Sequence, residues 1–376
     1  MLNGIKSKSI LKIIFRYIEK NRYLDIIKNN KKLQQRLDIS LDIYKEYYNQ
    51  IEIEIIPKKT EEKNNIFIND DLIDIKDIKI YFNSNYVEVN RKYFEDKEDI
   101  SKIRVFIDIK DKQKLINLFS NCKCIKKLKF IHSAQNNLTD ISYMFFNCQS
   151  LISVDMSRLK LDNVEDISSL FTRCVSLKEI IFPKNGLKHL TNMKHVFHSC
   201  ESLEKINLSN FNTSKVQTMH GLFAKCSSLK DIDVSNFDTS NVTDMEFMFQ
   251  GCTLLQVLDL LKFKTKKVKT MVGMFRDCTS LKLLKVDNFN TENVYNMTAM
   301  FSGCSSLDSL CLENWKTNNL YYMSDMFCKC SSLRELNISR LNLKNVKEME
   351  GAFRFCPEAL INQVKQQNKG LKESAF

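Results

Sequence analysis

The four residues Phe249-Gln250-Gly251-Cys252 belong to a pattern that recurs without insertion or deletion along most of the chain. In each copy a phenylalanine precedes a cysteine by three residues, and successive copies are 26 residues apart. A constant period between about 20 and 50 residues is typical of a solenoid, in which each repeat is one coil that buries its apolar side chains against its neighbours. The sequence therefore predicts a solenoid built on these pairs: Phe119/Cys122, Phe145/Cys148, Phe171/Cys174, Phe197/Cys200, Phe223/Cys226, Phe249/Cys252, Phe275/Cys278, Phe301/Cys304, Phe327/Cys330 and Phe353/Cys356.

The first half of each copy predicts a strand. In the copy 229–253, Leu229, Ile232 and Val234 form an LxxLxL element, and the aromatic residue Phe237 follows it. Alternating apolar positions indicate a strand with one buried side. The equivalents of Phe237 in other copies are also aromatic, and we expect each to fill the interior of its coil: Phe211, Phe263, Phe289 and Trp315.

The second half of each copy predicts a short helix. Asn241 stands where a helix could begin, and asparagine is a good N-cap because its side-chain oxygen accepts a free N–H of the first turn. Apolar residues then recur at helical spacing, at Val242, Met245, Phe249 and Cys252. The predicted fold class is therefore a right-handed α/β solenoid, with parallel short strands on one face and short helices on the other.

Cysteine usage favours free thiols over disulfides. Ten of the 13 cysteines occupy the repeat position, and Cys124, Cys311 and Cys328 fall outside that register. Helices pack about 8–10 Å apart, whereas a disulfide needs Cα atoms about 4.4–6.8 Å apart. Cysteines on neighbouring helices would therefore stay unpaired, which is typical of a reducing compartment and predicts a cytoplasmic location.

The chain outside the array predicts three smaller regions: a helical head over 1–50, a β-rich region and N-terminal cap over 51–110, and a C-terminal cap or tail over 357–376, with the solenoid itself over 111–356. The head and the β-rich region together form a small α+β N-terminal region. Hydrophobic alternation predicts strands over 51–55, 66–68, 78–81, 86–89 and 103–109, and the acidic segment 94–99 predicts a turn. Asp111 is expected to cap a helix that carries Leu115, Leu118 and Phe119.

The repeat text over 229–252 resembles the BspA-like leucine-rich repeat family, and this resemblance covers about 111–356. It implies a curved leucine-rich-repeat solenoid used for protein contacts, often as a secreted or surface adhesin of bacteria. The text differs from the commoner leucine-rich pattern, which has asparagine where Phe237 stands, so we expect an aromatic side chain to replace the buried asparagine ladder. The N-terminus shows no export signal or anchor, which argues against the adhesin role.

Residues 1–50 resemble an F-box, the helical module that docks substrate receptors on a ubiquitin ligase. The apolar stripe that carries this resemblance consists of Ile10, Leu11, Ile14, Phe15 and Ile18. The resemblance implies a docking helix for a ubiquitin-ligase linker subunit. The alternative is a plain amphipathic helix that caps the fold, because the later tryptophan of the module is absent.

Catalytic, cofactor and metal sites find no support in the sequence. Phosphate-binding loops and nucleophile elbows are missing, so we expect no enzyme activity and no cofactor. His195, His198 and Cys200 stand close together in sequence, but the histidine positions hold unrelated residues in other copies, so we interpret both as outward-facing and expect no metal. Despite a net charge of +12, no arginine stripe indicates nucleic acid, and no apolar run is long enough for a membrane.

The remaining candidate is the outward side of the predicted strands. Its residues vary between copies while the buried positions repeat, which indicates either a ligand-specific face or drift on a solvated surface. We therefore predict a non-enzymatic intracellular scaffold or adaptor that binds a protein partner on the strand face, with an F-box-like substrate receptor as one form of it and a surface adhesin as the alternative. The candidate partner-binding residues are Lys127, Lys129, Asp155, Glu179, Lys205, Asn207, Asp231, Asp233, Asp259, Lys285, Glu335 and Asn337.

Overall fold

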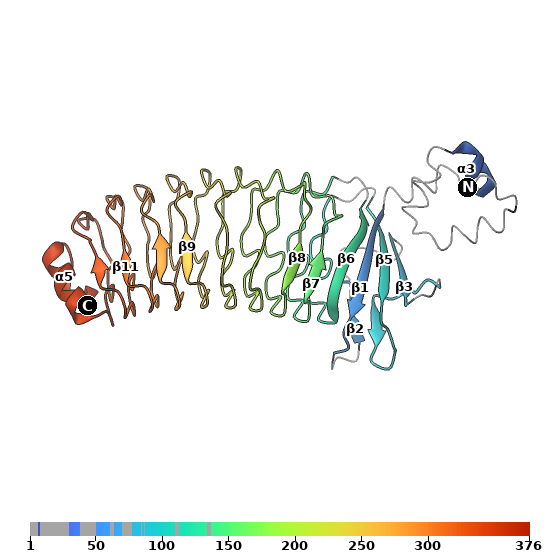
Figure 1. The fold of residues 1–376 in the computed structure, drawn as a ribbon, viewed down its shortest axis with the longest axis horizontal. Helices are drawn as coiled ribbons and strands as arrows, with labels where there is room; N and C mark the ends of the chain where they lie inside the picture. The colour runs from blue at the N-terminus through green and yellow to red at the C-terminus, as the bar shows by residue number, and fades with distance from the viewer. Residues whose placement is uncertain are drawn as a thin grey trace.

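The chain forms a long row of similar coils (Figure 1). A computed structural model describes residues 7, 30–37, 50–60, 64–69, 77–83, 85, 87–109, 113–133 and 137–376. Each coil has a strand side and an opposite side, and on the opposite side a parallel bridge joins it to the next coil 26 residues on, from Lys114↔Asp140 to Tyr322↔Glu348. The period in the sequence is therefore the register of the stack, while the handedness of the coil stays a prediction.

The strand side carries very short parallel strands. Each assigned strand pairs with its neighbour at a shift of 26 residues, as in Leu283↔Val257. The middle residue of a strand points inward and its two neighbours point outward, which gives Leu258 1% exposure. The assigned strands are β7 (Ser153–Asp155), β8 (Glu179–Ile181), β9 (Val257–Asp259), β10 (Leu283–Lys285), β11 (Ser309–Leu310) and β12 (Glu335–Leu336).

The helix predicted over 241–252 is wrong, because this segment consists of turns and one bridge residue, Asp244. Phe247 and Gly251 both have left-handed backbones, with φ of 55° and 70°, and a right-handed helix cannot contain them. The N–H groups of Phe247 and Phe249 donate to carbonyls of the next coil, at 2.8 and 2.9 Å. Backbone bonding between coils thus replaces the bonding within a helix, and the α/β class does not describe the array.

The predicted buried set is nevertheless confirmed, because Val242, Met245, Phe249 and Cys252 are all 0% exposed. The repeat phenylalanines form one continuous stack, with neighbouring ring centroids between 5.2 Å at Phe327–Phe353 and 6.0 Å at Phe249–Phe275. Such offset stacking adds about 0.5–1.5 kcal/mol per pair beyond the burial of apolar area. Each ring therefore depends on the coils before and after it.

Asparagine does not act as the expected helix cap. The Nδ2 of Asn241 donates to the carbonyl of Ser214 on the preceding coil at 2.7 Å. The aromatic side chain fills the interior as expected, since Phe237 is buried, while the preceding Asn236 is exposed and its Nδ2 donates to Leu208 O of the coil before at 3.1 Å. Equivalent bonds from the Asn241 position are made by Asn293, Asn319 and Asn345.

The cysteine ladder is unpaired for a different reason from the one expected. Coils stack like neighbouring strands, about 4.8 Å apart, so the separation predicted from helix packing is wrong. The cysteines are free, and from Cys148 onward each repeat thiol bonds to the carbonyl of the phenylalanine 29 residues earlier, as Cys252 Sγ does to Phe223 O at 3.2 Å. Burial raises the pKa of the Cys226 and Cys278 thiols to about 12, so the ladder consists of hydrogen-bonded neutral thiols.

The N-terminal strands extend the strand side of the array. β1 (Gln50–Pro57) pairs antiparallel with both β5 (Ile103–Asp108) and β6 (Ile125–Ser133), the first strand of the array. β3 (Ile78–Phe82) lies outside β5, which gives a six-stranded sheet in the order β3-β5-β1-β6-β7-β8. The alternation over 51–55 is confirmed, since its three isoleucines are 0% exposed.

Three other predictions for the N-terminal part of the chain are wrong in whole or in part. β2 (Asn64–Ile66) and β4 (Tyr93–Glu95) pair with each other, so Phe94 is a buried strand residue and the turn begins only at Asp96. The described residues 87–89 form no strand. Residues 113–122 form turns instead of the expected helix, because they already belong to the first coil, where Phe119 begins the aromatic stack.

The two ends of the described chain carry its helices. α3 (Lys31–Leu37) buries Leu33 and Leu37, but the predicted docking stripe Ile10–Ile18 lies outside the described residues. At the other end, α5 (Glu358–Gln367) and η3 (Glu373–Ala375) cover the last coil, where Phe376 stacks on Phe353 at 5.9 Å. Within the described ranges, no helix is both long enough and apolar enough to cross a membrane.

We predict that Phe249→Ala lowers the free energy of unfolding by about 3–5 kcal/mol, because it interrupts the aromatic stack at a fully buried position. Lys264→Ala is the control, since its side chain is 66% exposed and should change stability by no more than about 0.5 kcal/mol. Urea unfolding followed by circular dichroism measures both. Equal losses for the two variants would contradict the stack.

Thiol labelling tests the cysteine ladder. Cys311 is exposed, whereas the other cysteines are buried or half-buried. A thiol-reactive dye should therefore label one site rapidly in the native protein and all 13 cysteines only in denaturant. Cys311→Ser should abolish the rapid phase. Rapid labelling at several repeat cysteines, or mass-spectrometric detection of bridges between adjacent copies, would show that the ladder is placed wrongly.

Candidate binding face

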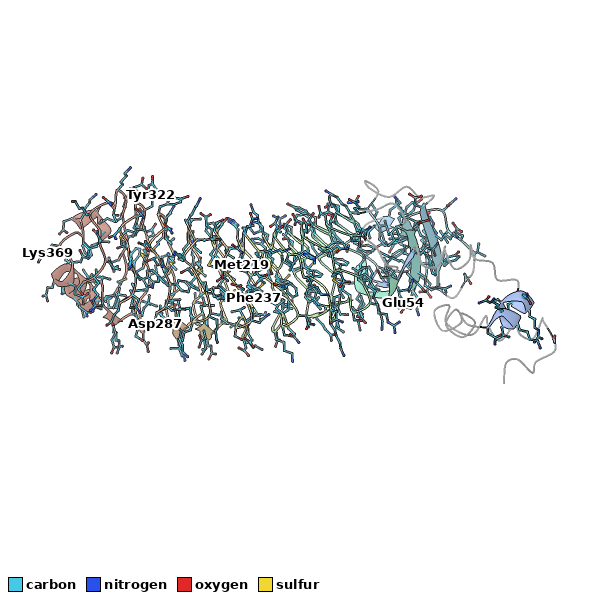
Figure 2. The ribbon with its side chains drawn as sticks, turned by 90° about the horizontal axis from the view of Figure 1, so that it is seen from above. Glu54, Met219, Phe237, Asp287, Tyr322 and Lys369 are labelled. Atoms are coloured by element: carbon cyan, nitrogen blue, oxygen red, sulfur yellow. The ribbon has the colours of Figure 1, made fainter. Side chains whose placement is uncertain are left out.

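The structure places the candidate partner-binding residues on the strand side of the array. Figure 2 shows Asp287, which follows β10, at one edge of the array and Tyr322 of the bridge side at the opposite edge. Two candidates, Asp155 and Lys285, are half-buried. The exposed ones are Lys127, Lys129, Glu179, Lys205, Asn207, Asp231, Asp233, Asp259, Glu335 and Asn337. Whether they bind a partner stays a prediction.

Some candidates pair with each other across neighbouring coils. Lys129 Nζ lies 3.3 Å from Asp155 Oδ2, and Lys285 Nζ lies 2.9 Å from Asp259 Oδ2. The bond from Lys285 lowers the pKa of the Asp259 carboxyl. Such surface pairs contribute little to stability because water screens them, so the lysines and acids can exchange each other for the charges of a ligand.

The second outward position of the strands also serves the fold. In five copies it holds Asp or Asn, whose Oδ1 accepts the N–H two residues on at 2.9–3.0 Å and closes a turn. The N–H of Ser235 thereby lowers the pKa of Asp233. Variation between copies therefore does not mark a position as free of a structural role at these residues: Asp155, Asn207, Asp233, Asp259 and Asn337.

A small hollow lies where the N-terminal sheet meets the array. It has a volume of about 210 Å³ and is bordered by β1, β6, β7 and β8. Its exposed apolar side chain is Ile181, at 43% exposure. Charges of both signs surround it, from Glu54, Lys127, Lys129, Asp155 and Glu179. Four candidates thus come together here, and the mixture of signs favours no particular ligand charge.

A larger hollow, of about 440 Å³, lies at the C-terminal end of the strand side. We call it the C-terminal hollow. Its floor is formed by buried leucines of three coils, including Leu284 and Leu310, and α5 contributes Gln363. The candidates that line it are Lys285, Glu335 and Asn337, and further lining residues are Leu283, Asp287, Ser309, Cys311 and Glu313.

The sequence-based candidates leave out the apolar residues of this surface. Val257 and Leu283 are partners in the β9–β10 register and are 51% and 46% exposed. The sequence could have indicated them, because both are apolar at an outward position that holds Lys, Ser, Glu or Asp in other copies. Gln363 had no such signal, because it comes from a helix outside the repeat.

The histidine segment differs from the expected outward-facing pair. His195 and His198 are half-buried. The imidazole of His195 packs directly against Gly221, where an added Cβ atom would lie only 2.3 Å from the Nδ1 of His195. Burial lowers the pKa of His195 to about 4. Another set, His220, Asp244 and Glu246, is the group among the described residues that could hold a metal ion.

Comparisons with solved structures gave distant leucine-rich repeat proteins of bacteria. A leucine-rich repeat protein from Eubacterium ventriosum is 17% identical, with a TM-score of 0.29 over 65% of this chain and 82% of that one. A leucine-rich cell surface protein from Faecalibacterium prausnitzii is 18% identical, with a TM-score of 0.26 over 67% of this chain and 82% of that one. At these scores neither structure indicates which residues bind a partner. No curated protein matches the chain.

A family model matches the array in three overlapping segments, 113–205, 184–283 and 253–365. The matches begin beyond residue 50, so they do not cover the F-box-like segment. They span the coils that form the binding face, including the strands of the array that line the two hollows. The chain therefore belongs to the family described as Mycoplasma protein of unknown function, DUF285.

Proposed function

We propose that this protein is a non-enzymatic repeat protein that binds an extended polypeptide along its strand side, with the C-terminal hollow as the principal contact. The observation that carries the proposal is the juxtaposition of exposed apolar side chains, Val257 and Leu283, with a hollow of about 440 Å³. Exposed apolar residues beside a concave surface are typical of interaction sites.

The size of the hollow suits side chains of an extended segment. Leu283 stands at its border, and buried leucines of neighbouring coils form its floor. An apolar side chain of the partner that enters the hollow would remove the exposed side chain of Leu283 from water, at roughly 25 cal/mol per Å² of apolar area. Each coil contributes one strand to this side, and neighbouring strands lie next to one another. An extended segment that crosses the strands can therefore contact several coils in succession.

The charge of the hollow favours a basic partner. Asp287, Glu313 and Glu335 line it as acids, while its one lining lysine, Lys285, is paired with Asp259 at 2.9 Å. Asp231 and Asp233 continue the acidic surface toward the centre of the array. Complementary charge speeds encounter and selects partners, so we expect lysine and arginine around the apolar anchor of the bound segment.

An intracellular adaptor and a surface adhesin would both use this face. The adaptor follows from the sequence prediction of a cytoplasmic chain, and its F-box-like form requires docking through Ile10–Ile18. The adhesin follows from the BspA-like resemblance. Fractionation of the native cells separates the two, because intact chain recovered at the cell surface excludes the adaptor.

Selection of random peptides on the purified full-length protein tests the proposal. We expect enriched peptides to combine basic residues with an apolar anchor and to bind more weakly as salt is raised. Leu283→Asp should reduce their affinity at least about tenfold, equivalent to about 1.4 kcal/mol. Tyr295→Asp is the matched control, since this residue is 40% exposed beside the bridge side and should leave affinity unchanged.

Two results would contradict the proposal. One is the recovery of no enriched peptide. The other is a selected peptide whose affinity falls with Tyr295→Asp but not with Leu283→Asp. Circular dichroism melting of both variants shows that they remain folded, which is expected because each changes an exposed side chain.

A further inference from the structure

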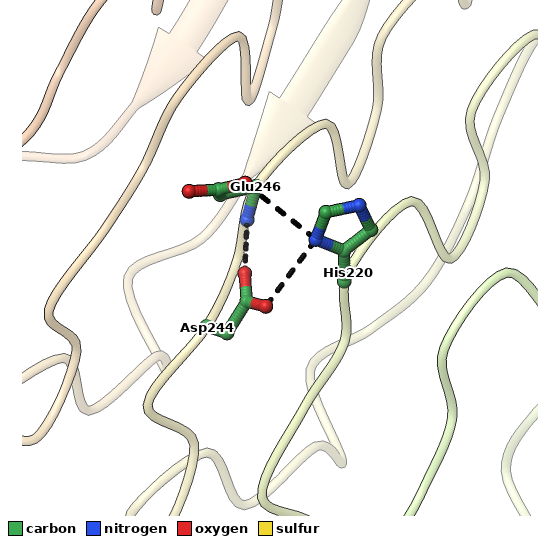
Figure 3. Close-up of side chains that lie close together, drawn as sticks. All are labelled: His220, Asp244 and Glu246. Atoms are coloured by element: carbon green, nitrogen blue, oxygen red, sulfur yellow. Dashed lines mark hydrogen bonds and ion pairs between the residues drawn. The ribbon is translucent and has the colours of Figure 1, made fainter.

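A cluster on the bridge side of the array has the donors of a metal site. His220 comes from one coil, and Asp244 and Glu246 come from the next (Figure 3). His220 Nδ1 lies 3.2 Å from Asp244 Oδ2 and 3.7 Å from Glu246 Oε2, and the donor atoms of all three residues lie within 4.8 Å of one another. Two donors that bind one zinc ion at about 2.0–2.2 Å in tetrahedral geometry lie roughly 3.3–3.6 Å apart, which is close to the distances from His220 to the two carboxylates.

Each of the two carboxylates is held in place through the oxygen that lies away from His220. Asp244 Oδ1 accepts the N–H of Glu246 at 2.9 Å, and Glu246 Oε1 accepts the hydroxyl of Thr270. The second oxygen of each carboxylate is the one that lies toward His220. Outer contacts of this kind orient the ligands of metal sites.

Two aromatic neighbours fix the imidazole of His220. Its ring packs edge-on against His195, with centroids 4.9 Å apart, and against Phe247 at 5.6 Å. Lys194, on the coil before that of His220, is a nearby positive charge that would repel a bound cation.

We propose that His220, Asp244 and Glu246 bind a divalent transition-metal ion of the zinc type, which ties together two adjacent coils in the middle of the array. The imidazole nitrogen selects against calcium and magnesium, which prefer oxygen ligands alone. One nitrogen and two carboxylate oxygens are a ligand set that zinc accepts, with water in the remaining position. The two carboxylates balance the charge of the ion.

The competing explanation is an ion pair between protonated His220 and the two carboxylates, without any metal. His220 Nδ1 and Asp244 Oδ2 already lie within hydrogen-bond distance of each other, at 3.2 Å. The two explanations differ in the response to added ion: an ion pair gains nothing from zinc, whereas a metal site is stabilised by mass action as the ion concentration exceeds the dissociation constant.

Calorimetric titration of the full-length protein with Zn²⁺ tests the proposal. A Cys311→Ser background removes the exposed thiol, which would otherwise compete for zinc. We expect one ion per chain, a rise in the melting temperature with Zn²⁺, and an absorption band in the visible range when Co²⁺ is used instead. His220→Ser and Asp244→Asn should each weaken zinc binding by about tenfold or more.

These substitutions are compatible with the fold, because other coils carry serine and asparagine at the same positions, as at Ser168 and Asn192. Asp166→Asn is the matched control: Asp166 is the equivalent residue in an earlier coil and makes the same turn, through Ser168 N–H at 2.7 Å. It should leave zinc affinity unchanged. Absence of binding by the parent protein, or equal binding by all variants, would overturn the proposal.

Discussion

The structure depends on hydrogen bonds that run from the backbone of one coil to the backbone of the next. The N–H groups of Phe223, Phe249 and Phe275 donate to carbonyls 25 residues further on, and the same pattern holds along the array. Because these bonds leave no place for an insertion, each coil must contain the same number of residues. Identical positions then lie directly above one another, which is why the phenylalanine rings, the thiols and the asparagine amides form continuous ladders.

This register also determines how binding sites arise. Residues that are 24 or 26 positions apart in sequence become spatial neighbours, as in the pair Val257 and Leu283 on the strand side and the pair His220 and Asp244 on the bridge side. The proposed polypeptide-binding face and the proposed metal site therefore lie on opposite sides of the array and in different coils. A partner on the strand face would not need to displace an ion from the other side.

The repeat made the buried residues and the strand side predictable, since Phe249, Cys252 and the isoleucines of β1 are found buried as expected. The backbone of the opposite side was not predictable from apolar spacing, because offsets of three and four residues suit both a helix and these stacked turns. Its left-handed positions hold His195, Phe247 and Gly273 in different copies, so no single residue type marks them. The C-terminal hollow needed the structure, because Gln363 of α5 joins it from outside the repeat.

The most direct test of this account is to compare two internal deletions. Removal of residues 255–280 takes out one whole coil and keeps the register, whereas removal of residues 255–267 takes out half a coil and places the strand side of one half against the bridge side of the other. The account predicts that the larger deletion folds, unfolds cooperatively and shortens the particle by roughly 5 Å in small-angle scattering, while the smaller deletion disrupts folding. A stable half-coil deletion together with an unfolded whole-coil deletion would contradict the proposed register.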